Sequence, residues 1–373
     1  MITSYPLPLL LKREGVCYVA AIKFGLKPGS VSHFIPRPKG RGYYNLRTLS
    51  LKGEKVPIAI GIGFSGQHLL IDNPQLLIIP SLLYNKQKYL CTMANIDNLK
   101  DICTQVRRDI VRMVHGPQSG HPGGSLGCTE FFVALYFDIM KHNPQNFTMD
   151  GKGEDLFFLS NGHISPVWYS VLARSGYFPV SELSTFRMIN TRLQGHPTTH
   201  EGLPGVRVAS GSLGQGLSVA LGAAQAKKLN GDNSIVYTLH GDGEMQEGQI
   251  WEAAMYAAAK KVDNIISTID YNGQQIDGST DHVLPMGDMA AKWVAFGWNV
   301  LHMDGNNIEE VIATFNHAKT LTGKGQPIMI IMKTGMGKGV DFMEGSHKWH
   351  GIAPNDEQLK AALEQLQTTQ VDY

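Results

Sequence analysis

Cysteine and long hydrophobic runs are both scarce in this sequence. Its 373 residues include four cysteines, which form no C-x-x-C pair and no metal-finger spacing, so we expect reduced thiols without a catalytic role. No stretch reaches the roughly 18 uninterrupted apolar residues of a membrane span. The first residues have no basic stretch ahead of their apolar run and no clear small-residue cleavage site. These absences favour a cytoplasmic protein without a membrane partner.

An excess of either charge is also missing from the chain as a whole. The formal net charge is +1, which predicts neither a nucleic-acid partner nor an acidic tail. The distribution is nevertheless uneven. Residues 1–92 hold 12 Lys and Arg against 3 Asp and Glu, whereas the remainder holds 21 against 29. Such an imbalance marks a basic arm or a boundary in composition.

Residues 1–92 show no sustained periodicity, because prolines and glycines interrupt their apolar runs. Met93 precedes the first regular element, so our hypothesis is that the protein starts there and that residues 1–92 are a mis-annotated upstream extension. A targeting arm and a small accessory module are the alternatives. Detection of a peptide from this segment in the native protein would contradict the hypothesis. Residues 93–373 would then form the functional domain.

From Met93 onward, helices and strands are expected to alternate. The first helix has apolar residues at steps of three and four, namely Ile96, Leu99, Ile102, Val106, Ile110 and Met113. Apolar segments at 156–160, 234–241, 264–270, 298–304 and 327–333 follow the strand pattern, and further helices are expected at 164–176, 217–229, 246–261, 308–321 and 355–367. This alternation predicts an α/β fold, with a mostly parallel sheet and helices on both faces. Ligands in such folds bind beyond the carboxyl ends of the strands.

Polar residues follow two of these expected strands. Asp242 comes directly after the segment 234–241, between Gly241 and Gly243, and Asn272 follows the segment 264–270. Carboxylate and amide oxygens are hard ligands, which suit Mg²⁺ or Ca²⁺ and not zinc. Magnesium usually takes one or two carboxylates and completes its shell with phosphates, so the pair indicates a metal that tethers a diphosphate. A surface turn is the alternative, because Asp-Gly and Asn-Gly are common turn dipeptides.

A glycine-rich run at residues 210–216 opens the expected helix 217–229. The backbone amides of such a run, together with the helix N-terminus, can meet anions or the edges of a cofactor. The alternative is a tight turn that serves only to pack the helix against the sheet.

Four of the 14 histidines lie in short segments where the glycine or proline beside each is typical of loops: His121, His163, His196 and His350. A lone histidine is more often structural or merely exposed. Four of them in loops of an α/β domain, beside an expected diphosphate site, are candidates to donate hydrogen bonds to phosphate or sugar hydroxyls. They can also exchange protons near neutral pH.

Several of these segments together resemble the transketolase family. GDGEMQEGQIWEA followed by DYNGQQIDG is similar to the thiamine-diphosphate motif of that family. Five further segments resemble the family in order, namely SGHPGGSLG (119–127), LSNGHISPVWYS (159–170), GHPT (195–198), GLPGVRVASGSLGQGLSVALG (202–222) and SHKWHG (346–351). The resemblance covers residues 96 to about 356.

The resemblance implies a thiamine-diphosphate-binding fold that holds its cofactor through Mg²⁺, with Ca²⁺ or Mn²⁺ as alternatives. It implies three metal ligands: the side chains of Asp242 and Asn272 and the backbone carbonyl of Gln274. The implied cofactor-binding residues are His163, Gly211, Leu213, Asp242, Gly243, Asn272 and His350. The implied catalytic residues are His121, His196 and His350, with His121 and His196 placed towards the sugar.

The resemblance also implies a partner chain. In the family, a glutamate on a second domain promotes deprotonation of the thiazolium carbon, and no counterpart of that domain follows the segment that ends at Tyr373. We therefore expect the N-terminal subunit of a split transketolase of the pentose phosphate pathway. Its C-terminal partner subunit would carry the pyrimidine-binding domain, in a heterotetramer with two copies of each chain.

The expected reaction is transfer of a two-carbon ketol unit from a ketose phosphate to an aldose phosphate. Three alternatives remain open. The chain could resemble a split 1-deoxyxylulose-phosphate synthase, the alpha subunit of a 2-oxo-acid dehydrogenase, or a non-catalytic relative that kept the fold. The histidine segments favour transketolase over the two other enzymes, and the metal residues argue against a non-catalytic relative.

Overall fold

The computed structural model describes residues 9–13, 16–20, 44–51, 54–60 and 80–373, with side chains from Ile96 onward. The chain divides into two compact units, Met1–Ile78 and Ile79–Tyr373. The first unit contains two antiparallel strand pairs, β1 (Leu9–Arg13) with β2 (Val16–Ala20) and β3 (Tyr44–Leu51) with β4 (Glu54–Ile60). The domain boundary expected at Met93 falls inside helix α1 (Pro80–His115). The hypothesis that residues 1–92 are an extension stays a prediction.

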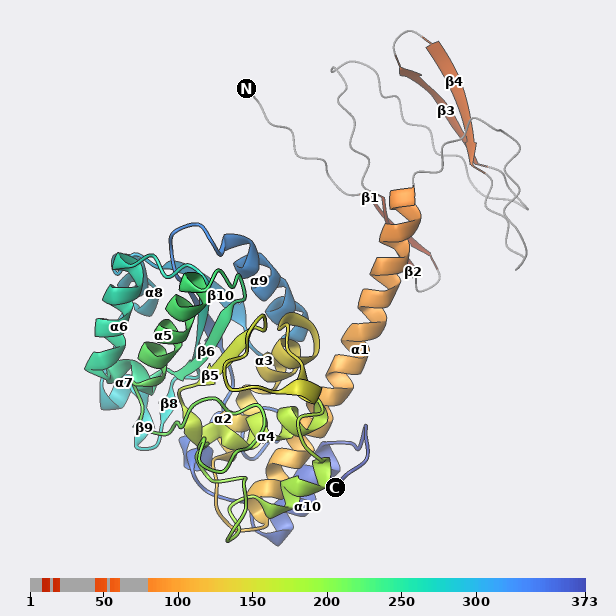
Figure 1. Ribbon diagram of the computed structural model, residues 1–373. Coiled ribbons are helices and arrows are strands. Elements are labelled where there is room, and N and C mark those ends of the chain that lie inside the picture. Colours follow the sequence, from red (N-terminus) through yellow and green to blue (C-terminus); the bar gives the residue numbers. More distant parts are fainter. Residues whose placement is uncertain (1–8, 14–15, 21–43, 52–53, 61–79) are drawn as a thin grey trace. The chain divides into compact units, whose positions relative to one another are not determined.

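The second unit is built on a five-stranded sheet in which every neighbouring pair is parallel (Figure 1). The strand order is β10 (Asn299–Asp304), β11 (Ile328–Lys333), β7 (Ile265–Tyr271), β6 (Val236–Gly241) and β5 (Leu156–Leu159). A short antiparallel pair, β8 (Gln274–Gln275) and β9 (Gly278–Ser279), follows β7. The α/β fold that the sequence predicts is confirmed, and the five expected strands occur within two residues of their expected limits.

Helices cover both faces of the sheet, because successive side chains of a strand point to opposite faces. Phe157 and Leu159 of β5 pack in the core beneath α1, α3 and α4, whereas Leu156 and Phe158 pack in the core beneath α5, α6 and α8. The helices after α1 are α2 (Pro122–Gly127), α3 (Thr129–Ala134), α4 (Ser165–Arg174), α5 (Gly216–Leu229), α6 (Gly248–Ala259), α7 (Thr280–Val283), α8 (Met289–Ala295), α9 (Ile308–Leu321) and α10 (Asp356–Gln365). Shorter turns of helix are η1 (Leu135–Ile139), η2 (Pro144–Asn146), η3 (Gly162–Ile164), η4 (Val180–Thr185), η5 (Gly243–Gln246) and η6 (His347–His350).

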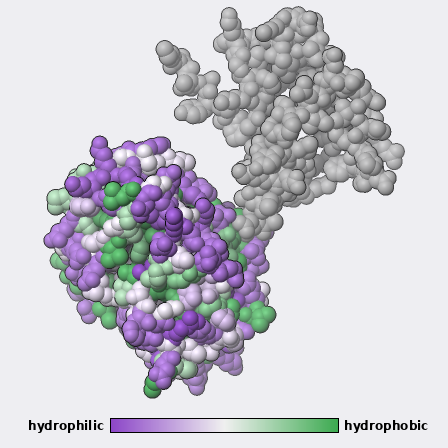
Figure 2. All heavy atoms as spheres, viewed as in Figure 1, coloured by the Kyte–Doolittle hydropathy of each residue, from purple (hydrophilic) through white to green (hydrophobic). Residues whose placement is uncertain are grey.

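Helix α1 presents the apolar face that its periodicity predicts. Five of the six predicted positions are buried, and Ile96 packs at the edge of the same core. On the face shown in Figure 2, hydrophobic residues lie scattered among hydrophilic ones. Within the part of the chain that the structure describes, no helix is both long and apolar enough to span a bilayer.

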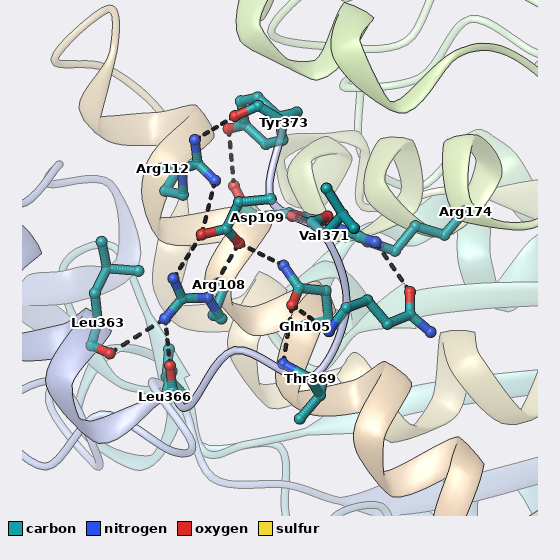
Figure 3. A network of polar contacts seen from close by, with 12 residues as sticks. Gln105, Arg108, Asp109, Arg112, Arg174, Leu363, Leu366, Thr369, Val371 and Tyr373 are labelled. Carbon is teal, nitrogen blue, oxygen red and sulfur yellow. Dashed lines mark hydrogen bonds and ion pairs between the residues drawn. The ribbon is translucent and has the colours of Figure 1, made fainter.

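A buried polar network joins α1, α4 and the C-terminal segment (Figure 3). Asp109 of α1 is fully buried and accepts hydrogen bonds from Ser170 at 2.7 Å and from Arg174 Nη2 at 2.8 Å, both on α4. Asp372 accepts from Arg108 Nη2 at 2.6 Å. The hydrogen bond from Arg108 lowers the pKa of Asp372 to about 2, so this carboxylate is ionised at neutral pH. The network fastens the last residues of the chain to the first helix of the sheet domain.

Candidate functional site

Asp242 lies directly beyond the carboxyl end of β6, and its side chain is almost fully buried. One carboxylate oxygen accepts the backbone N–H of Gly243 at 2.7 Å and the other accepts that of Gly273 at 2.6 Å. Burial and the neighbouring charge of Asp270 raise the pKa of Asp242 to about 7. A bound cation would stabilise the ionised form of this buried carboxylate, because it offsets the cost of desolvation and the repulsion from Asp270.

Asn272 lies at the adjacent strand end, just after β7. Its Nδ2 donates to Asp270 at 2.8 Å, and its Oδ1 accepts the N–H of Gln274 at 2.8 Å. Gly273, between them, donates to Asp242, so a hydrogen bond connects the two strand ends. The structure therefore brings the three residues predicted as metal ligands into one group at the carboxyl edge of the sheet.

The donor set in this group fits magnesium. Among the side chains that the structure describes, no three His, Cys, Asp or Glu gather to hold a metal. A cation at Asp242 would meet the carboxylate of Asp242, the amide oxygen of Asn272 and the carbonyl of Gln274, which are all oxygen donors. Such a site leaves coordination positions for water and phosphate, as magnesium requires.

Glu244 connects the glycine-rich loop to the sheet and is also buried. Its carboxylate accepts the N–H of Gly214 at 2.8 Å, the N–H of Gly241 at 3.1 Å and the hydroxyl of Ser160. Burial acts to raise the pKa of Glu244, but His240 and these hydrogen bonds outweigh it and lower the pKa below its usual value. Glu244 is therefore an ionised anchor for the loop at residues 210–216, a role that the sequence did not reveal.

We expect Glu244→Gln to weaken binding of thiamine diphosphate about 5- to 150-fold. The amide can accept at only one end, so a buried donor loses its partner at a cost of about 1–3 kcal/mol. Calorimetric titration of the cofactor in Mg²⁺ measures the change. Glu357→Gln, at an exposed position of α10, is the control and should bind as the native protein does. Equal affinity in all three proteins would contradict the anchoring role.

The four histidines predicted from loop segments lie in one cluster. The ring centroid of His121 is 5.2 Å from that of His163, 6.1 Å from that of His196 and 5.6 Å from that of His350. His163 and His350 are 4.9 Å apart. The glycine-rich loop touches this cluster, because a Cβ on Gly211 would lie 2.7 Å from the His196 ring. Gly211 also has a φ of +126°. Both the close approach of His196 and this backbone conformation therefore require glycine at this position.

The histidines of the cluster are held neutral. Burial lowers the pKa of each one. For His121, burial and then the charges of His350 and Arg187 bring the pKa to about 4. The buried Nδ1 atoms of His121 and His350 have no hydrogen-bond partner among the described residues. A neutral imidazole donates at one nitrogen and accepts at the other, which suits recognition of hydroxyl and phosphate groups.

Stability is expected to depend on pH and Mg²⁺ through Asp242. Its pKa rises from 3.8 to about 7 on folding, so the folded state holds the proton more tightly than the unfolded state. The metal-free protein should therefore lose stability as the pH rises from about 4 to about 7. If Mg²⁺ binds the ionised carboxylate, as the sequence predicts, it should raise the melting temperature at pH 8 much more than at pH 5. Thermal unfolding with and without Mg²⁺ tests this, and Asp242→Asn should abolish the difference.

Asp270 is a second residue that the sequence did not reveal. It is buried at the end of β7, where it accepts hydrogen bonds from Thr334 and from the thiol of Cys128. Burial raises its pKa. A charged residue near the end of a predicted buried strand was the available signal. Cys128 is a free thiol, as is Cys103.

A sequence model of the family described as "Transketolase, thiamine diphosphate binding domain" matches residues 99–370. The 6-deoxy-6-sulfo-D-fructose transketolase subunit SqwG of Clostridium sp. (strain MSTE9) is 42% identical over 248 residues, which are 66% of this chain and 88% of that protein. An apulose-4-phosphate transketolase subunit of Phocaeicola vulgatus is 39% identical over 260 residues, covering 70% of this chain and 90% of that protein.

Full-length transketolases give the same result. The transketolase of Campylobacter jejuni superposes with a TM-score of 0.66 at 35% identity, over 72% of this chain and 42% of its own. Human transketolase is 35% identical over 68% of this chain and 39% of its own length. The chain thus spans about two fifths of these full-length enzymes, but most of the length of the two subunits above.

Proposed function

The chain belongs to the transketolase family, in which it corresponds to the N-terminal subunit of a split enzyme, and we propose that it transfers two-carbon ketol units between sugars. One observation carries this proposal. The four histidines, the glycine-rich loop and the Asp242 group come from separate segments and are linked by contacts at the carboxyl edge of one sheet. The relatives are transketolases or their subunits, which favours this reaction over the other thiamine enzymes.

We assign the diphosphate end of the cofactor to the Asp242 group. Asp242, Asn272 and the carbonyl of Gln274 would hold Mg²⁺, and the N–H of Gly243 would donate to a diphosphate oxygen. Gly211 and Leu213 would lie against the pyrimidine ring. Thiamine diphosphate supplies the carbanion-stabilising chemistry when bound. The protein positions the cofactor and surrounds it with fixed charges and dipoles.

The histidine cluster would bind the reacting sugar and move its protons. We assign His163 and His350 to the diphosphate side, and His121 and His196 to the hydroxyls of the transferred unit. His350 also lies close enough to His121 to contact the same sugar. Because burial keeps these imidazoles neutral, each can take a proton from a hydroxyl at one nitrogen.

We propose a C-terminal transketolase subunit with the pyrimidine-binding domain as the partner. Three related proteins are named as transketolase subunits, which supports a two-chain enzyme. Leu213 of the glycine-rich loop is 37% exposed, so this loop reaches the surface, where a second chain can complete the site. The heterotetramer, the cytoplasmic location and the place in the pentose phosphate pathway stay predictions from the sequence.

The relatives indicate the class of sugar. One is named for a sulfonated ketose and two for a ketose phosphate. We propose that the substrates of this protein likewise carry an anionic group, phosphate or sulfonate, at the end remote from the transferred unit.

The proposal is tested by formation of sedoheptulose 7-phosphate from xylulose 5-phosphate and ribose 5-phosphate, with thiamine diphosphate and Mg²⁺. The chain is assayed alone and mixed with a C-terminal transketolase subunit. Activity only in the mixture supports the split enzyme, and activity of the chain alone contradicts it. No activity in either, with these sugars and with sulfonated and branched ketoses, would contradict transketolase function.

A further inference from the structure

Helix α2 has glycine at three of its six positions, and the proposed function uses none of the three. A Cβ on Gly123 would lie 2.6 Å from Cγ of Met336. A Cβ on Gly127 would lie 2.9 Å from the carbonyl oxygen of Gly335. The glycines therefore leave room for a neighbour to pack directly on α2. This neighbour is the loop at residues 334–350, which runs from the end of β11 to the end of η6.

The helix and the loop each carry one histidine of the cluster. His121 is the N-cap of α2, and His350 is the last residue of η6. The N–H of Gly337 in the loop donates to the carbonyl of Gly123 in the helix at 2.9 Å. The two ring centroids are 5.6 Å apart. This distance depends on how the loop lies on the helix.

Asn306, just beyond the carboxyl end of β10, joins the start of the loop to the end of the helix. Its Oδ1 accepts the N–H of Gly335 at 2.8 Å. Its Nδ2 donates to the carbonyl of Gly127 at 2.9 Å and to the carboxylate of Glu130 in α3 at 3.3 Å. The reversed orientation of the amide would place Oδ1 against two other oxygens, so the hydrogen bonds determine the orientation.

A buried ion pair supports this amide from the other side. Nη2 of Arg107 in α1 lies 2.7 Å from both carboxylate oxygens of Glu130, and both side chains are buried. Nε of Arg107 donates to the carbonyl of Lys338 at 3.0 Å, which holds the loop at a second point. The pair therefore fixes the carboxylate that Asn306 contacts.

We propose that Asn306 is a positioning residue, which sets the place of His350 beside His121 by fastening the loop at residues 334–350 to α2. The inference rests on the proposed function, which assigns both histidines to the reacting centre. Both N–H groups of the Asn306 amide are already donated to protein oxygens, so Asn306 acts through His350 and not on the cofactor or the sugar. Accurate placement matters because a shift of about 1 Å in a reacting group can cost about 100-fold in rate.

Two substitutions break this connection in different ways. Asn306→Ala removes all three hydrogen bonds of the side chain. Asn306→Asp keeps the shape of the side chain and an acceptor for Gly335. It cannot donate to Gly127, however, and it places a second negative charge beside Glu130. Similar results from both variants would show that the link to α2 is the part that matters.

Asn307→Ala is the matched control for lost stability. Asn307 is the neighbouring asparagine and the N-cap of α9, where its side chain accepts the N–H groups of Glu309 and Glu310. Removal of this cap destabilises the protein. The side chain makes no hydrogen bond to the loop or to α2 among the described residues, so the control separates a loss of stability from a change of position.

The position of His350 is tested first on the full chain, without the cofactor or the partner, by NMR of the histidine rings. Both Asn306 variants should shift the signals of His350 and His121. The signals of His142, whose hydrogen-bond partners lie outside these segments, should stay in place. Unchanged His350 signals in both Asn306 variants, or an equal shift in Asn307→Ala, would overturn the proposal.

Kinetics of the two-chain enzyme test the consequence for the reaction. Both Asn306 variants should lower kcat about 10- to 100-fold and leave the KM for ribose 5-phosphate within about threefold, because the loop displaces a reacting group and not the sugar-binding residues. Asn307→Ala should keep kcat within about twofold, although it unfolds at a lower temperature. A kcat within twofold of the native value in both Asn306 variants would refute the positioning role.

A double-mutant cycle shows whether Asn306 acts through His350. Once His350→Gln has removed the imidazole, its position no longer matters, so adding Asn306→Ala should lower kcat by less than about twofold more. Losses that multiply in the double variant would overturn the inference while transketolase function stands. Absence of turnover in the native two-chain enzyme would contradict transketolase function, and the NMR signals would still decide whether Asn306 positions His350.

Discussion

Asp242→Ala is expected to weaken binding of thiamine diphosphate by more than about 100-fold and to abolish activity of the two-chain enzyme. Asp242 is the carboxylate that faces the expected metal, and its charge would be neutralised by that metal on binding. Loss of the one charged ligand from a magnesium site removes more than about 3 kcal/mol of binding free energy, because the protein then no longer holds the cation that would bind the diphosphate. Calorimetry with the cofactor in Mg²⁺ measures the affinity, and the coupled assay measures turnover.

A control distinguishes this effect from misfolding. Asp277→Ala changes an exposed carboxylate between β8 and β9 and should leave cofactor affinity unchanged. Because the raised pKa of Asp242 shows that its ionised form is unfavourable without a cation, Asp242→Ala should melt no lower than the native protein at pH 8 without Mg²⁺. Retained affinity in Asp242→Ala would show that the diphosphate is held elsewhere.

Arg174→Met is expected to destabilise the folded protein by about 3–5 kcal/mol. It leaves the carboxylate of Asp109 fully buried without its cation, and breaking a buried pair from one side costs about this much. The urea concentration at the midpoint of unfolding measures the loss. Since the network also ties the C-terminal segment to α1, the same substitution should expose residues 366–373 to proteolysis.

Two further variants show whether the buried charge is the cause. Arg192→Met breaks a partly exposed pair with Glu182 and should cost no more than about 1 kcal/mol. Asp109→Leu combined with Arg174→Met removes both charges and should recover much of the stability, because an apolar pair of similar volume fits such a site. A double variant as unstable as Arg174→Met alone would point to lost packing and not to the buried charge.

The strands and helices of the sheet domain could be predicted because the positions that are buried in them carry apolar residues at characteristic spacings. The run at residues 327–333 is apolar at nearly every position, as a strand covered on both faces must be. The insertion of β11 between β7 and β10 could not be predicted. An apolar run indicates that a strand is buried, but it does not indicate which strands lie beside it. The start of α1 was also placed too late. The helix begins at Pro80, and proline suits the first turn of a helix because its missing N–H has no partner there.

The residues of the candidate site also divide into those that the sequence predicts and those that it does not. His121 and Asp242 could be singled out because glycine or proline flanks them in short, chemically specific segments. Glu244 could not, because its role depends on distant residues. The partners of Glu244, Ser160 and Gly214, lie 84 and 30 residues away.

The strand order has a consequence for how the protein is made. Strands β5, β6 and β7 are neighbours in space as well as in sequence, so they can pair as they emerge from the ribosome. Strand β11 is synthesised last of the five, yet it fills the gap between β7 and β10. Until residue 333 has left the exit tunnel, the outer edge of β7 stays unpaired, and such an edge recruits strands of other chains. Nascent chains stalled between β10 and β11 are therefore expected to expose the edge of β7 to aggregation.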